Sequence, residues 1–207
     1  MLTVGNNAAV VEEVLCGGLL SCPCCGGRLA GWGWAARRVV LVAGRSWSVA
    51  VWPRRARCAS CGVTHVLLPA WLWARRCDDG VMVIGDMLAR AARGAGFRGI
   101  AAASGVPEST VRSRLRRFRS SAGRLREGFT RLAGALSPDP VPLGPAGGLL
   151  ADAVVAVAVA GGAARERWPA LAVTAWEVAA AVTMGSLLSP SVAFARSWDG
   201  VAGPALG

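Results

Sequence analysis

Four of the seven cysteines form two copies of one motif, Cys-x-x-Cys-Gly, and the paired copies predict a metal site. Two thiolates at this spacing can hold one tetrahedral zinc ion from a tight turn, and the following glycine allows the positive φ that such a turn needs. Two turns supply four ligands, which leaves no open position for a water nucleophile. The sequence therefore predicts a closed, structural Zn²⁺ site whose ligands are Cys22, Cys25, Cys58 and Cys61.

The other thiols and the single histidine leave smaller alternatives open. Cys24 could replace a neighbouring ligand, but the two turns match only if it is spare, and Cys16 and Cys77 are expected to bind no metal. His65 could substitute for a cysteine, although four better ligands exist. No secretory signal is visible at the start, so we expect a reducing compartment, where metal binding is favoured over disulfides. A set of buried free thiols is the alternative to the zinc site.

Residues 97–115 carry a second pattern, which is typical of two short helices joined by a tight turn. Small Ala101 lets the helices approach, Gly105 supplies a left-handed turn residue, and Pro107 suits the start of the second helix. An earlier helix at about 81–92 would complete a three-helix unit. The side chains expected to face its core are Ile84, Leu88, Ile100, Val106, Val111 and Leu115.

The second helix of this pair, expected at about 107–119, is the predicted DNA-recognition helix. The alternative is an ordinary helical hairpin with a solvated basic face. The run of arginines at 112–119 is too one-sided for a surface on which acidic and basic residues pair, and it favours DNA. Arg112 is the expected guanine contact, because its guanidinium fork matches two acceptors on that base. The expected DNA-binding residues are Arg98, Glu108, Ser109, Thr110, Arg112, Ser113, Arg116 and Arg117.

The cysteine turns must be held together by strands. Between Cys25 and Cys58, the runs 38–43 and 47–52 read as strands, and Gly44-Arg45-Ser46 reads as the turn between them. Two cysteine turns joined by a β-hairpin describe a zinc ribbon, which we assign to residues 14–77. The next module, 78–136, holds the helix-turn-helix.

Arginines and tryptophans crowd the ribbon. The arginines of 37–38 and 54–57 are expected either at a solvated strand edge or on DNA phosphates, and the two readings stay open. For the tryptophans, a role in the small core is favoured over base stacking. These tryptophans are Trp32, Trp34, Trp47, Trp52, Trp71 and Trp73.

The last part of the chain is apolar. A linker at 137–142 precedes two apolar stretches, 147–164 and 169–188, which we assign to a helical hairpin at 146–190. Alanine and glycine supply much of both stretches and are weak membrane formers, so two packed soluble helices are favoured over a membrane hairpin. A homodimer interface on these helices would suit repeated DNA half-sites.

The charge is strongly positive and unevenly placed. The net charge is +11, all 23 basic residues are arginine, and 54% of residues are hydrophobic, which excludes wholesale disorder. Residues 1–77 carry +7 and residues 78–136 carry +6, whereas residues 137–207 carry −2. A polyanion is the expected partner, nucleic acid first, and it should bind the first two modules.

Two resemblances follow from these motifs. Ile-Ala-x-x-x-Gly-Val-Pro-x-x-Thr-Val-Arg at 100–112 resembles bacterial helix-turn-helix repressors and the promoter-reading end of extracytoplasmic-function sigma factors. Residues 14–130, with Cys-Pro-x-Cys-Gly and Arg-x-Arg-Cys-x-x-Cys-Gly-x-Thr-His-x-Leu-Leu-Pro, resemble the DNA-binding head of insertion-sequence transposases. They also resemble a small uncharacterised bacterial family that carries this head without a nuclease. The resemblance implies zinc at the four cysteines and DNA at 97–117.

The chain departs from a transposase after residue 136. A transposase needs a ribonuclease-H-like domain with three carboxylates that hold two metal ions. Only five acidic residues remain, and no strand-rich segment surrounds them: Asp139, Asp152, Glu166, Glu177 and Asp199. No nucleophile–base pair or phosphate loop appears, so we expect no enzyme activity.

The sequence thus predicts an α+β protein with a β zinc ribbon, a helix-turn-helix module and a helical tail. We expect a cytoplasmic protein that binds double-stranded DNA sequence-specifically, as a transcriptional regulator or a mobile-element accessory protein. The alternative is a truncated or inactive transposase fragment that retains only the DNA-binding head. A membrane-anchored regulator is a third, disfavoured reading.

Overall fold

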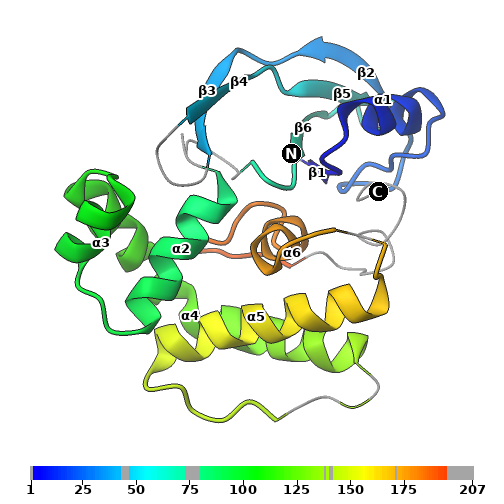
Figure 1. Ribbon diagram of the computed structural model, residues 1–207. Coiled ribbons are helices and arrows are strands. Elements are labelled where there is room, and N and C mark those ends of the chain that lie inside the picture. Colours follow the sequence, from blue (N-terminus) through cyan, green and yellow to red (C-terminus); the bar gives the residue numbers. More distant parts are fainter. Residues whose placement is uncertain are drawn as a thin grey trace.

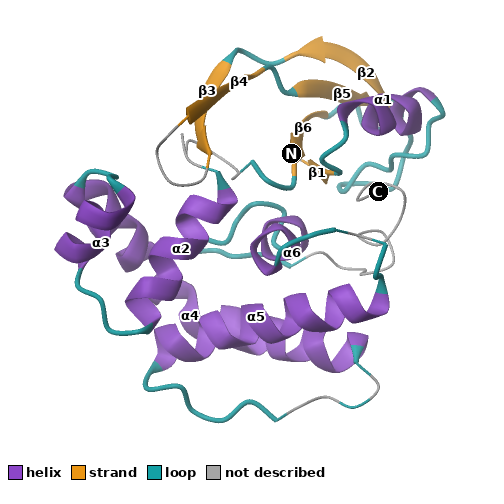
Figure 2. Ribbon diagram, in the orientation of Figure 1, coloured by secondary structure: helices purple, strands orange, loops and turns teal. Residues whose placement is uncertain are grey.

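The computed structural model describes residues 2–42, 47–72, 80–137, 139, 142–170 and 172–194. Strands dominate the N-terminal part of the described chain, and helices make up the part that follows (Figures 1 and 2). The expected α+β class, with a small sheet followed by helices, is confirmed.

The main sheet has four strands in the order β1-β6-β5-β2. These strands are β1 (Leu2–Val4), β2 (Leu29–Trp34), β5 (Arg54–Cys58) and β6 (Thr64–Pro69). β1 runs parallel to β6, and the other neighbours are antiparallel. The sequence analysis did not anticipate β1 or helix α1 (Ala8–Cys16), which pack onto the sheet through aliphatic side chains.

The hairpin expected between the cysteine turns is present but is not the strand pair that carries them. β3 (Arg38–Val42) and β4 (Trp47–Val51) pair antiparallel, as the two runs predicted, and the predicted turn at 44–46 lies outside the described residues. The hairpin extends from a second pair, β2 and β5, which leads directly to the cysteines. The two pairs together form an arch over β1 and β6 (Figure 1).

Five helices follow the sheet. They are α2 (Val81–Ala92), α3 (Phe97–Ser104), α4 (Glu108–Leu136), α5 (Leu149–Arg167) and α6 (Ala175–Val182). The predicted helix at 81–92 is confirmed. The second helix of the basic pair was expected to end near 119, but α4 is 29 residues long and ends at Leu136. The buried positions 118, 122, 125 and 129 keep a helical spacing, so the apolar stripe continues beyond the basic run.

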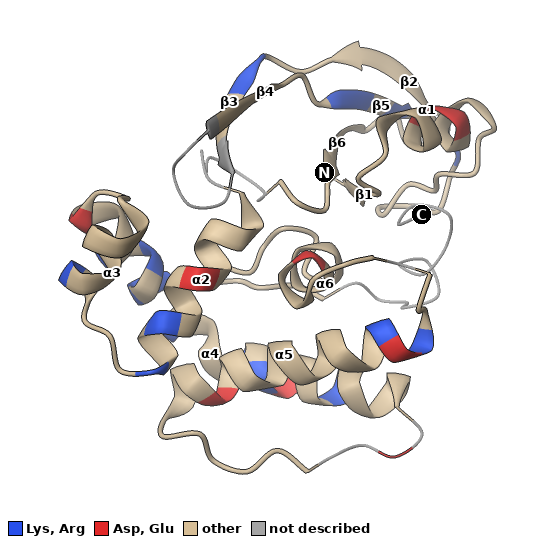
Figure 3. Ribbon diagram, in the orientation of Figure 1, with Lys and Arg blue, Asp and Glu red and all other residues tan. Residues whose placement is uncertain are grey.

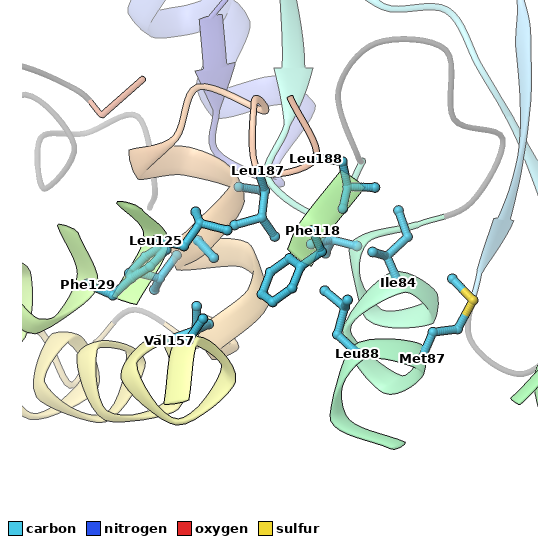
Figure 4. Close-up of a cluster of buried hydrophobic side chains, with 14 of the residues drawn as sticks. Ile84, Met87, Leu88, Phe118, Leu125, Phe129, Val157, Leu187 and Leu188 are labelled. Carbon is cyan, nitrogen blue, oxygen red and sulfur yellow. The ribbon is translucent and has the colours of Figure 1, made fainter. Parts of the chain in front are cut away.

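One hydrophobic core runs through all five helices. Figure 4 shows the part of it where α2, α4 and α5 meet. Phe118 and Phe129 of α4 are fully buried in it, together with Ile84 of α2, Val157 of α5 and Leu187. α5 lies along α4, so the face of α5 that meets α4 is buried within the chain (Figure 1). No helix among the described residues combines the length and apolar character that a membrane crossing requires.

Candidate metal centre and basic helix surface

The two cysteine turns have the same backbone geometry. In the first turn, the N–H of Gly26 donates to the Cys22 carbonyl over 2.8 Å, and in the second the N–H of Gly62 donates to the Cys58 carbonyl over 3.0 Å. Both glycines have positive φ, 74° and 72°, as the motif predicted. One turn precedes β2 and the other follows β5, and together they bring two pairs of thiols to one point.

The four predicted ligands form one cluster. The sulfurs of Cys25 and Cys58 are 3.5 Å apart, and those of Cys22 and Cys61 are 3.8 Å apart. All four sulfurs lie within 4.8 Å of one another. A tetrahedron with metal–sulfur bonds of about 2.3 Å has sulfurs about 3.8 Å apart. The cluster therefore has the dimensions to hold one metal ion.

Backbone N–H groups lower the thiol pKa of two of the four cysteines, Cys58 and Cys22. The N–H of Cys61 lowers the pKa of the Cys58 thiol to about 6, burial opposes this effect, and the N–H of Ser60 adds to it. Burial raises the pKa of Cys22, but the N–H groups of Cys24 and Cys25 outweigh it, and the net shift is downward. Thiolate is the metal-binding form of cysteine, so both shifts favour a bound cation.

Cys25 behaves in the opposite way when no cation is present. The N–H of Gly27 lowers its pKa, but hydrogen bonds to the sulfurs of Cys58 and Cys61 outweigh this and raise it to about 12. Four thiolates this close would repel one another, and a proton held on Cys25 relieves that repulsion.

His65 and Cys24 lie beside the cluster. His65 is buried, with Nε2 3.3 Å from the sulfur of Cys22, and burial lowers its pKa, so the ring is neutral. Cys22, Cys24 and His65 form a second group with metal-ligand spacing. Because this group shares Cys22 with the four-cysteine set, the two cannot be filled independently. Cys16 is exposed and belongs to neither group, and Cys77 lies outside the described residues.

The turn between α3 and α4 has the expected geometry. Gly105 is left-handed, with φ of 63°, and its N–H donates to the Ala101 carbonyl over 2.6 Å. Val106 is buried behind the turn, and Pro107 caps α4 with a non-helical backbone. The side chains predicted to face inward are all buried: Ile84, Leu88, Ile100, Val111 and Leu115.

The predicted DNA-binding residues occupy one end of the helical part. Six of the eight side chains are exposed: Arg98, Glu108, Ser109, Arg112, Arg116 and Arg117. Thr110 and Ser113 are half-buried. Arg114, which the sequence placed in the same basic run, is buried at 8% exposure and belongs to the inner face of α4.

The ring of Phe97 contacts two of the exposed arginines. The guanidinium carbon of Arg112 lies 4.3 Å from the centre of the Phe97 ring, and that of Arg98 lies 5.7 Å from it. Glu108 lies 3.9 Å from Arg98. The sequence analysis missed Phe97 as part of this surface, although an aromatic residue beside Arg98 was a usable signal.

The arginines of α4 divide into two groups. Towards its C-terminal end, Arg126 lies 3.8 Å from Asp152 and Arg131 lies 3.8 Å from Glu127. Within the part of the chain that the structure describes, no acidic side chain pairs with Arg112, Arg116 or Arg117. Positive charge is therefore uncompensated at the α3 end of α4 (Figure 3).

The tryptophans of the sheet were expected in the core, and for three of them this was wrong. Trp32, Trp34 and Trp52 are 51%, 62% and 55% exposed. Each lies against an arginine: Arg57 is 4.8 Å from the Trp32 ring centre, Arg54 is 5.1 Å from Trp34, and Arg37 is 5.7 Å from Trp52. Trp71 is half-buried, the side chain of Trp47 is not described, and Trp73 lies outside the described residues.

Comparison with known families finds similarity in the sheet part of the chain. A family model described as a domain of unknown function (DUF6431) matches residues 22–96. The matched segment contains all four clustered cysteines, β2 to β6 and α2, and it stops before α3. No curated protein and no solved structure matches the chain. The similarity therefore includes the cysteine cluster and excludes the exposed arginines of α4.

Proposed function

We propose that this protein binds double-stranded DNA sequence-specifically, as a transcriptional regulator or an accessory protein of a mobile element. The observation that carries the proposal is the uncompensated group of exposed arginines at the start of α4. These side chains lie on the second of two helices, α3 and α4, that are joined by a turn with a left-handed Gly105. In such arrangements the first turns of the second helix enter the major groove.

Arg112 is the proposed base-reading side chain. Its position over Phe97 restricts the guanidinium before DNA arrives, which lowers the entropy lost when it binds the two acceptors of a guanine. Arg116 and Arg117 lie about one turn further along the helix and are the proposed phosphate contacts.

The metal in the cysteine cluster is proposed to be Zn²⁺. Tetrahedral sites with four thiolates favour zinc or iron, and paired Cys-x-x-Cys turns are typical of structural zinc. The ion would join the turn before β2 to the turn after β5 and so stabilise the sheet, with no catalytic role. Reduced thiols and a DNA partner are both consistent with a cytoplasmic location, which belongs to the same proposal.

Selection from a random pool of duplexes, with purified zinc-loaded protein, tests the proposal. We expect an enriched motif, and its symmetry would report whether a monomer or a dimer binds. Affinity should fall with salt, with a log–log slope of about −4.5 if about five phosphates are contacted. A slope near zero would contradict DNA binding.

Two arginine variants on the same helix make the test specific. Arg112→Ala should abolish the enrichment, because it removes the proposed guanine contact. Arg131→Ala removes the same charge about 28 Å further along α4, where the side chain is exposed, and should leave the motif unchanged. Equal loss in both variants would indicate general attraction to a basic protein instead of sequence recognition.

A further inference from the structure

A cavity of about 660 Å³ lies under the arch of the sheet, apart from the proposed duplex surface. Its walls come from α1, from β1, β2, β4, β5 and β6, and from the loops beside them. Small-molecule sites in proteins have volumes of about 300–1,000 Å³, whereas normal protein packing leaves few voids larger than a water molecule. The hollow therefore has the size of a ligand site.

Three tryptophans line this cavity: Trp34, Trp52 and Trp71. Trp34 and Trp52 are also more than half exposed, so they connect the cavity with the outer surface. The rest of the wall is mainly aliphatic, from residues such as Val11, Leu67 and Leu72. Broad indole faces beside aliphatic side chains suit a flat aromatic ligand.

One fixed ion pair provides the polar part of the wall. Arg54 donates to both carboxylate oxygens of Glu12 over 2.9 Å, and its third nitrogen donates to the Gly33 carbonyl over 2.7 Å. The hydrogen bond from Arg54 holds the pKa of Glu12 below its ordinary value, so this carboxylate stays charged at neutral pH. A rigid acceptor beside stacking surfaces can accept a hydrogen bond from the polar edge of a heterocycle.

The surroundings of the cavity are basic. Arg37 is exposed and lies against Trp52, which lines the cavity. β3 and β5, which form the arch, both carry arginines (Figure 3). A ligand that enters here would therefore combine a flat aromatic ring with negative charge close to it.

We propose that the tryptophan-lined cavity binds an unpaired nucleobase, with the neighbouring arginines on its phosphates. The base stacks on Trp34 and Trp52, and Glu12 accepts from its polar edge. The source of the base is a single strand of DNA or a free nucleotide, which present the same chemistry. This site is separate from the duplex surface on α4, so each can fail without the other.

Binding of single-stranded DNA to the full, zinc-loaded chain tests this proposal. The probe is a labelled oligomer of ten deoxythymidines, and its control is an abasic oligomer of equal length, which keeps the phosphates and lacks the bases. We expect the thymidine oligomer to bind at least about tenfold more tightly, because each stacked base adds about this much or more. Equal binding of the two oligomers would overturn the proposal, because phosphate attraction alone would then explain it.

Tryptophan variants locate the effect. Trp52→Ala and Trp34→Ala should each weaken binding of the thymidine oligomer about tenfold, and Trp52→Phe should retain most of it. Trp32→Ala is the matched control, because Trp32 is equally exposed and equally paired with an arginine but does not line the cavity. Loss of the same size in Trp32→Ala would overturn the assignment. Zinc content and thermal melting should match the wild type in each variant compared.

Competition experiments separate the sources of the base. If thymidine monophosphate displaces the oligomer and loses this ability in Trp52→Ala, the site accepts a free nucleotide. If thymidine monophosphate does not compete, but Trp52→Ala still weakens binding of the oligomer, the site accepts a single strand. Either result supports binding of a base. An anionic aromatic dye such as anilinonaphthalene sulfonate that fills the cavity, and that neither the oligomer nor thymidine monophosphate displaces, would overturn base binding. Arg112→Ala should leave oligomer binding unchanged, which separates this proposal from the duplex proposal.

Discussion

The side chain of Asn6 joins the two parts of the described chain, because its Nδ2 donates to Oε1 of Glu177 over 2.8 Å. The other end of the Asn6 amide accepts from the N–H of Trp71 over 3.2 Å. Glu177 is buried, and its second oxygen accepts from both the N–H and the hydroxyl of Thr174 over 2.8 Å. A single amide thus connects the sheet to the capped start of α6.

Removal of this link should destabilise the protein. Asn6→Ala leaves one oxygen of a buried carboxylate without its donor, which costs about 1–3 kcal/mol of free energy of unfolding. Asn6→Asp should cost more, because it places a second carboxylate beside Glu177. Thermal denaturation of the zinc-loaded protein measures both changes.

Asn7→Ala is the control for this pair. Asn7 accepts from the N–H groups of Ala9 and Val10 and caps α1, so its loss should cost about 1 kcal/mol and leave Glu177 unaffected. Asn6→Asp with a stability equal to that of Asn6→Ala would show that the carboxylates do not meet.

Two adjacent glycines in α5 should respond to alanine with opposite signs. A Cβ on Gly161 would collide with the backbone of Ala175, whereas a Cβ on Gly162 meets nothing within 4 Å. Gly161→Ala should therefore force α5 and α6 apart and cost about 1–3 kcal/mol. Gly162→Ala should stabilise the helix by about 0.5–1 kcal/mol. Chemical denaturation measures both, and the same sign for both would contradict the close approach of the helices.

The sequence indicated the cysteine cluster and the turn at Gly105 because their signals are local. A glycine after each cysteine pair and a glycine before Val106-Pro107 specify backbone conformations within a few residues. The length of α4, by contrast, is not set by residues close together in the sequence. Beyond residue 119, the helix is stabilised by packing along α5, which comes later in the chain.

The exposed tryptophans have a similar explanation. The core of the sheet is filled by aliphatic residues, among them Val11, Leu15 and Leu67. Val11 lies before residues 14–77, to which the ribbon was assigned, so the sequence analysis did not count it as core. Without α1, the tryptophans are the large side chains expected to fill the core of the ribbon. With α1 in place, Trp32, Trp34 and Trp52 remain on the outer surface. The pairing of β1 with β6 is long-range and left no short motif.

Phe97 should influence duplex affinity without a contact of its own to DNA. Phe97→Leu keeps an apolar side chain but removes the ring against which Arg112 rests, so the guanidinium loses its restraint. We expect the affinity for the selected duplex to fall about two- to fivefold, the range of an exposed cation–π contact. Titration of the labelled duplex measures this fall, and Phe97→Tyr should restore wild-type affinity. An unchanged affinity in Phe97→Leu would show that the ring does not position Arg112.

Serine replacements of Cys58 and Cys24 should distinguish a metal ligand from a cysteine that binds no metal. Cys58→Ser removes one of the four clustered sulfurs and should release the metal and unfold the sheet. Cys24→Ser should retain both the metal and the folded sheet. Metal content by atomic absorption and far-ultraviolet circular dichroism measure the two outcomes. Metal retained in Cys58→Ser but lost in Cys24→Ser would assign the site to the group that contains His65.

Zinc binding at neutral pH should release protons, one of them from Cys25. At about pH 7.5, Cys58, whose pKa is about 6, is already a thiolate, whereas Cys25, with a pKa raised to about 12, still holds its proton. Zinc needs thiolates, so the metal-free cluster binds more protons than the loaded one, and the affinity for zinc should rise with pH. Calorimetric titration in two buffers with different protonation enthalpies measures the net release. An affinity for zinc that stays constant between about pH 6.5 and 8.5 would contradict a protonated Cys25, since no proton would then compete with the metal.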